Sequence, residues 1–137
     1  LQKVITKKIS FDFDGCLGDR REVRLYCRQL LSGAPTSIEV WIVSSRFRFP
    51  PNGLDNADIY DVAYQLGIST DHIIFTSQQP KAEWFEVYGQ DFIWHLDDNP
   101  QEVEQITNNT NVVALSCLNS DFINRGNKLL GLTSKPF

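Results

Sequence analysis

Five short apolar segments alternate with five amphipathic segments along the 137-residue chain, and this alternation constrains the fold more than any other feature. The apolar segments have the length and β-branched content of strands, and the segments between them have the spacing of helices. We expect strands at residues 7–13, 38–44, 72–75, 91–96 and 111–117, and helices at 23–31, 57–66, 81–88, 99–106 and 120–130. This order predicts an α/β domain with a doubly wound, mainly parallel five-stranded sheet.

The end of the first predicted strand, ISFDFDG at residues 9–15, carries two aspartates on one face. Aspartate is disfavoured in strands, and like charges on one face of a strand repel each other. At about 4 Å and an effective dielectric constant near 20, this repulsion is roughly 4 kcal/mol. The sequence therefore predicts a compensating cation near Asp12 and Asp14.

Further polar residues follow the other predicted strands, at the edge where doubly wound sheets bind their ligands. Ser44 ends the second strand, Lys81 begins the helix after the third, and Asp97 and Asp98 follow the fourth. Several carboxylates cannot remain ionised at one site without a cation, and oxygen ligands favour a hard divalent ion. We therefore expect Mg²⁺ as the cofactor, with Asp12, Asp14, Asp97 and Asp98 as candidate ligands.

Four motifs in this order carry a family resemblance. They are DFDG at residues 12–15, IVSS at 42–45, Lys81, and HLDDNP at 95–100. Together they resemble the four motifs of the haloacid dehalogenase (HAD) superfamily of phosphotransferases, over about residues 5–118. The chain departs from the family at Cys16, where threonine is usual. A cysteine-phosphatase alternative needs an arginine-rich loop after Cys16, and CLGDRRE does not resemble one.

The resemblance implies roles for three charged side chains. Asp12 would attack phosphorus and become an aspartyl-phosphate. Asp14 would protonate the leaving oxygen and later activate water, and its backbone carbonyl would ligate Mg²⁺. Lys81 would neutralise the phosphoryl charge and hold Asp12 in place.

The remaining motif residues are implied to bind the phosphoryl group and the metal. Ser44 would hydrogen-bond a phosphoryl oxygen, with the backbone amides of Gly15 and Ser45 as further donors. Asp97 would ligate Mg²⁺, and Asp98 would support the metal or its waters. The sequence does not decide which of these two aspartates is the direct ligand.

The spaces between the motifs, residues 15–43 and 46–80, are too short for a cap domain, so we expect an open site. The loop after Ser44 contains RFRF at residues 46–49, where arginines alternate with aromatic side chains. Arg46, Arg48 and Phe49 are therefore candidate substrate-binding residues, through charge and stacking. A loop that packs its phenylalanines inward explains the same pattern equally well.

The sequence thus predicts a magnesium-dependent phosphatase that hydrolyses phosphate monoesters through an aspartyl-phosphate. Its resemblance to capless family members implies a large substrate such as a phosphoprotein, phosphotyrosine included. The alternatives are a nucleotide or polynucleotide 3′-phosphatase, and a catalytically idle phosphate-binding or interaction module. A net charge of −4 argues against a nucleic-acid partner.

Composition also bears on location and extent. Three cysteines, an odd number without metal-ligand spacing, fit a reducing compartment. We find neither a secretory signal pattern nor an apolar run near the ~20 residues of a membrane span, so we expect a cytoplasmic protein without a membrane partner. Residues 1–137 are expected to form one domain, and the lack of methionine indicates a piece of a longer chain.

Overall fold

The computed structural model describes residues 6–33 and 37–132, so the ends of the predicted domain, residues 1–5 and 133–137, lie outside the described part. Five strands form one sheet in the order β3-β2-β1-β4-β5, and every neighbouring pair is parallel. The strands are β1 (Thr6–Phe11), β2 (Ser37–Ser44), β3 (Ile73–Phe75), β4 (Phe92–Asp97) and β5 (Val113–Ser116). The predicted doubly wound α/β fold is confirmed, with an entirely parallel sheet.

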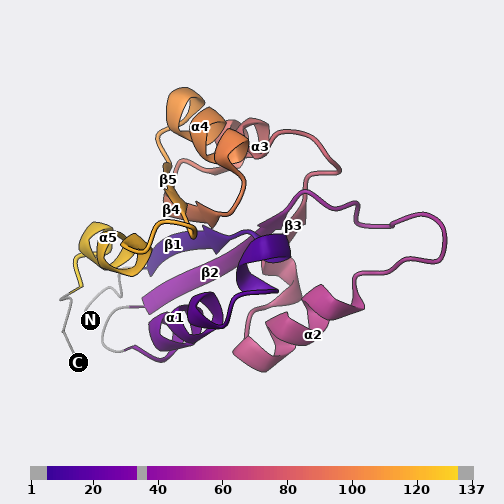
Figure 1. Cartoon of the computed structure of the whole chain (residues 1–137), viewed down its shortest axis with the longest axis horizontal. Helices are drawn as coiled ribbons and strands as arrows, with labels where there is room; N and C mark the ends of the chain where they lie inside the picture. The colour runs from indigo at the N-terminus through magenta and orange to yellow at the C-terminus, as the bar shows by residue number, and fades with distance from the viewer. Residues whose placement is uncertain (1–5, 34–36, 133–137) are drawn as a thin grey trace.

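Helices cover both faces of this sheet (Figure 1). The helices are α1 (Arg21–Ser32), α2 (Ala57–Leu66), α3 (Lys81–Tyr88), α4 (Pro100–Asn109) and α5 (Phe122–Leu129). One apolar cluster joins the sheet to α1, α2 and α5, and a second joins its other face to α3 and α4. Within the described ranges, no helix has both the length and the apolar character needed to cross a membrane.

The helices form because their apolar residues repeat with helical spacing. In α1, the buried residues Val23, Tyr26, Cys27 and Leu30 follow the i, i+3, i+4, i+7 pattern of one helix face. In α4, Pro100 occupies the first turn, where its missing N–H is not needed, and the side chain of Asn99 caps the helix by accepting from the Gln101 amide.

The order of the strands fixes the position of the site. Strand β1 is central: Phe11 is paired with Ile42 of β2 on one side and with Leu96 of β4 on the other. The chain builds outward from β1 through β2 and β3, and then returns to place β4 on the opposite side. The carboxyl ends of β1 and β4 therefore flank the switch point, where open α/β sheets bind ligands.

Candidate active site

The chain turns sharply at the carboxyl end of β1, through a π-type turn over Phe13–Leu17. Asp12 is still extended, but Gly15 has φ +71°, a conformation that favours glycine. The Asp12 amide donates to the Leu96 carbonyl at 2.8 Å, which ties the start of the turn to β4. This turn places the Asp12 side chain in the interior, with 5% of its surface exposed.

The expectation that Asp12 and Asp14 share one face of a strand is wrong. Strand β1 ends at Phe11, and Asp14 lies within the turn with an exposed side chain. Its carboxylate points to Arg46, which donates from Nε at 2.9 Å and from Nη2 at 2.7 Å. The turn thus separates the two carboxylates, and each has its own cationic partner.

The cationic partner of Asp12 is Lys81. It begins α3, which packs on the face of the sheet opposite to α1, α2 and α5. Its Nζ donates to Oδ1 of Asp12 at 2.6 Å and to Oδ2 of Asp97 at 2.7 Å. Only 2% of Lys81 is exposed. A buried ammonium is unfavourable without anionic partners, so these two carboxylates are what stabilises its charge.

The side chain of Asp97 is fully occupied by protein donors. Besides Lys81, the ring of His95 donates to its Oδ2 at 2.7 Å, and the backbone amide of Asn99 donates to its Oδ1 at 3.0 Å. His95 is itself buried, and its Nδ1 accepts from the Ser10 hydroxyl at 2.8 Å. Apart from the Asp12 carboxyl group, no hydrogen-bond donor from residues 6–33 or 37–132 reaches the Asp98 carboxylate, so Asp98 is the freer of the two aspartates to bind a metal.

Burial and neighbouring charges shift the pKa values of the groups in this cluster in opposite directions. Burial raises the pKa of Asp12 to about 8; Lys81 opposes this rise and the Asp97 charge adds to it. Although burial opposes it, hydrogen bonding to His95 and Lys81 holds the pKa of Asp97 below its usual range. Burial also lowers the pKa of His95, so the ring is neutral. The pKa of Lys81 is raised, because the two carboxylates outweigh the effect of its own burial.

The oxygens of Asp12, Asp97 and Asp98 lie within 4.8 Å of one another, as the ligands of one metal ion would. With all three carboxylates ionised, as they would be around a bound cation, they and the Lys81 ammonium carry a net charge of −2. A set of oxygen donors with this excess charge matches a hard divalent cation. Gly15 also fits the site tightly, since a Cβ there would collide with the Asp98 carboxylate. The residues present therefore fit Mg²⁺.

A cavity of about 620 Å³ opens above this cluster. Most of its lining is polar, and it includes Asp12, Asp14, Gly15, Ser45, Gln78 and Lys81. Two lining features were not expected from the sequence. Gln78 lines the cavity, and its backbone has φ +67°. Its backbone amide donates to the Ser45 carbonyl at 2.7 Å, which holds it in this position. Glu102 of α4 lines it as well and accepts from the Lys81 amide.

Two of the expected phosphoryl donors have other partners. Ser44 is completely buried, its Oγ accepts from the Arg46 amide at 3.1 Å, and it is not part of the cavity lining, whereas Ser45 is. The Gly15 amide donates to the carboxylate of Asp19. Of the adjacent serines, Ser45 therefore faces the cavity, a choice that the motif IVSS alone does not make.

The three expected rim residues diverge. Arg46 is bound to Asp14 and to Asp58 of α2, and its guanidinium lies 5.3 Å from the Phe13 ring centroid. Arg48 stacks on Phe75 at 5.3 Å, and Phe49 is 86% exposed. Asp58 was missed because it lies 12 residues from Arg46, on a helix face that looks like ordinary solvent-exposed surface.

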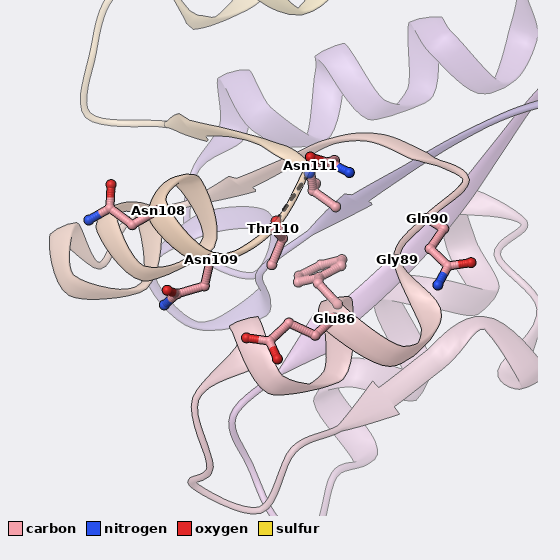
Figure 2. A pocket seen from close by; sticks show the side chains of 9 residues that line it. Glu86, Gly89, Gln90, Asn108, Asn109, Thr110 and Asn111 are labelled. Atoms are coloured by element: carbon pink, nitrogen blue, oxygen red, sulfur yellow. Dashed lines mark hydrogen bonds between the residues drawn. The ribbon is translucent and has the colours of Figure 1, made fainter.

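A separate cavity of about 370 Å³ lies between the carboxyl-terminal ends of α3 and α4 (Figure 2). It is at the edge of the sheet where β4 and β5 begin, opposite the edge that holds Lys81 and Asp12. Its lining is rich in side-chain amides, and Figure 2 shows the lining residues at the ends of both helices and in the turns that follow them: Glu86, Gln90, Asn108, Asn109 and Asn111. It shares no lining residue with the carboxylate cavity and is not part of the candidate active site.

These features define an α/β protein with a buried lysine–carboxylate site at the switch point of its sheet. In its fold the chain is similar to the crystal structure of an uncharacterized protein from Corynebacterium glutamicum. The TM-score is 0.70 at 19% identity, over 95% of this chain and 98% of that one. No family model and no curated protein matches the chain. At this identity the likeness shows the fold alone, so the chemistry must be assigned from the site.

Proposed function

We propose that this protein is a capless phosphatase of the HAD type, dependent on Mg²⁺, that hydrolyses phosphate monoesters through an aspartyl-phosphate on Asp12. The observation that best supports it is the buried ammonium of Lys81, 2.6 Å from Asp12 and beside two more carboxylates. Phosphoryl transfer depends mainly on positioning and on neutralising charge. A lysine and a divalent cation around one carboxylate nucleophile provide both.

Asp12 is the nucleophile of this proposal. Lys81 fixes its Oδ1, which leaves Oδ2 free to attack phosphorus in line with the leaving oxygen. Asp12, Asp98 and the backbone carbonyl of Asp14 would hold Mg²⁺, which supplies positive charge to the phosphoryl oxygens when bound. Asp97 orients Lys81 and lies behind these ligands, since its own oxygens are already hydrogen-bonded.

Asp14 is the general acid and base. It lines the cavity near the leaving group, but its carboxylate is paired with Arg46. To act as the acid, Asp14 would exchange Arg46 for the substrate and take up a proton from water, which it then passes to the leaving oxygen; Asp58 keeps the guanidinium paired. A carboxyl group within reach of the leaving oxygen contributes about 10²–10⁴-fold in such reactions.

The alternative of an idle phosphate-binding module is less well supported. Burying a lysine between two carboxylates opposes folding unless the geometry is good, and replacing such groups with apolar residues is often stabilising. An idle domain therefore gains nothing from Lys81, Asp12 and Asp97.

Cys16, Cys27 and Cys117 are buried free thiols, which supports a cytoplasmic location.

The direct test is hydrolysis of p-nitrophenyl phosphate by purified protein, with Mg²⁺ or with a chelator. We expect turnover only with Mg²⁺ and its loss in Asp12→Asn, which should remain folded because Asp97 still pairs with Lys81. Full activity in chelator, or substantial turnover by folded Asp12→Asn, would refute the proposed mechanism.

A further inference from the structure

The loop between β2 and α2, residues 45–56, extends away from the body of the domain (Figure 1). It has a defined structure. The side chain of Asn56, 4% exposed, donates to the carbonyls of Phe47 and Arg48 at 2.9 and 3.1 Å. The outer turn is closed by a bond from the Leu54 amide to the Pro51 carbonyl. Hydrogen bonds thus hold the loop in one conformation, so that it can form one side of a binding site.

A cavity of about 900 Å³ lies between this loop and the start of α2. Its large apolar lining residues come from the loop: Phe47, Pro50, Pro51 and Leu54. Phe47 is 44% exposed and Leu54 is 68% exposed. Large apolar side chains that are grouped on the surface and rimmed by charges are typical of binding sites.

This loop cavity adjoins the carboxylate cavity. Gln78 lines both of them, and the consecutive residues Ser45 and Arg46 line one each. A phosphoryl group bound at Lys81 would therefore place its leaving group toward the loop. Small-molecule sites have about 300–1,000 Å³, and the two cavities together exceed that range. The space accommodates a substrate larger than a simple phosphate ester.

The charge of the loop cavity restricts the leaving group. Its lining holds one arginine against three aspartates, a net charge of −2: Arg46, Asp55, Asp58 and Asp61. Arg46 is already neutralised by Asp58 and Asp14. Within residues 6–33 and 37–132, Asp61 has neither a salt-bridge nor a hydrogen-bond partner. The cavity therefore favours cationic groups and disfavours the further phosphates of a nucleotide or polynucleotide.

We propose that the loop cavity is the leaving-group subsite of this protein and that it binds a phosphorylated peptide with apolar and basic residues beside the phosphorylated one. The inference rests on the proposed phosphatase function and deepens it by naming the substrate class. The phosphoryl group lies at Lys81, the apolar part of the peptide packs on Pro50, Pro51 and Leu54, and a lysine or arginine of the peptide pairs with Asp61.

Binding to the Asp12→Asn protein tests this without turnover. The probes are two phosphotyrosine peptides of equal length, one flanked by lysines and one by glutamates, and a 3′-phosphorylated oligonucleotide. We expect the lysine peptide to bind at least about tenfold more tightly than either other probe, and added salt to weaken it. In the same background, Asp61→Asn should weaken it about three- to tenfold, and Asp61→Glu should retain most of the affinity.

Asp71→Asn is the matched control, because it removes one exposed acidic charge at the opposite edge of the sheet. Equal affinities for the two peptides, tighter binding of the oligonucleotide, or equal losses in Asp61→Asn and Asp71→Asn would each overturn the subsite. Turnover of p-nitrophenyl phosphate separates the two proposals. If it occurs while the peptides bind alike, the phosphatase stands and the subsite falls. If it is absent while the lysine peptide binds as expected, the phosphatase falls together with the leaving-group role, and the loop cavity stands as a peptide-binding site only.

Discussion

Lys81→Met removes the charge at the centre of the site while keeping a side chain of similar length. In the wild type, Nζ lies 2.6 Å from Asp12 and 2.7 Å from Asp97, and all three side chains are at most 7% exposed. Removing one partner of a buried ion pair costs about 3–5 kcal/mol, because the remaining charge is left unpaired. Asp12 can relieve part of this by binding a proton, so we expect a loss of about 3 kcal/mol in the free energy of unfolding.

That loss can be expressed as a melting temperature. Unfolding entropy is about 2.1 cal/mol/K per residue, or about 0.29 kcal/mol/K for 137 residues. We therefore expect Lys81→Met to melt about 10 °C below the wild type in chelator. Mg²⁺ should raise the melting temperature more in the variant than in the wild type, because it is then the only cation beside the carboxylates.

The assay is thermal unfolding followed by circular dichroism, in chelator and in Mg²⁺. Lys128→Met, at an exposed position on α5, is the matched control and should melt like the wild type. If Lys81→Met melted within about 3 °C of the control in chelator, the lysine would not be stabilising the buried carboxylates and this account of the site would be wrong.

Three further predictions concern the same cluster. Gly15→Ala should lower Mg²⁺ affinity, measured by calorimetry, at least about tenfold. The added Cβ would displace the Asp98 carboxylate, and the backbone at position 15 would keep a φ of +71° that alanine disfavours. An affinity equal to that of the wild type would contradict this. His95→Leu should lower the free energy of unfolding by about 1–3 kcal/mol in urea, because Asp97 and the Ser10 hydroxyl each lose a buried partner, and an unchanged midpoint would exclude that role. In chelator, the raised pKa of Asp12 makes the folded state bind more protons than the unfolded state between pH 4 and about 8. The free energy of unfolding of the wild type should therefore fall, relative to that of Asp12→Asn, as pH rises through this range.

Much of the site could be predicted because it depends on local pattern and on one rule of topology. Alternating strands and helices dictate a parallel sheet, and a parallel sheet brings its carboxyl ends to one edge. Asp12, Lys81, Asp97 and Asp98 follow successive strands or begin the next helix, so their convergence followed from chain order without any knowledge of contacts. The cation predicted beside Asp12 was inferred from repulsion with Asp14, but in the structure Asp14 lies apart beside Arg46, and the cationic partner of Asp12 is Lys81.

The tertiary structure decided where each neighbouring side chain points. A strand pattern puts Asp12 and Asp14 on one face, but β1 ends at Phe11 and the turn that begins at Phe13 breaks that alternation, so Asp14 lies beside Arg46. Likewise, the motif IVSS does not distinguish the buried Ser44 from Ser45, which faces the cavity. Turn geometry of this kind depends on hydrogen bonds to other elements, which local periodicity does not encode.

Long-range partners were likewise beyond the sequence. Asp97 and Asp98 are adjacent and chemically identical, yet only Asp97 is enclosed by donors from α3, β4 and the following turn. Arg46 was expected to face a substrate, but it is paired with carboxylates 32 and 12 residues away along the chain. The sequence by itself thus determined the fold class and the residues that meet at the carboxyl edge, because both follow from local periodicity. The pairing of each charge and the loop cavity depend on packing between distant segments, which only the folded chain specifies.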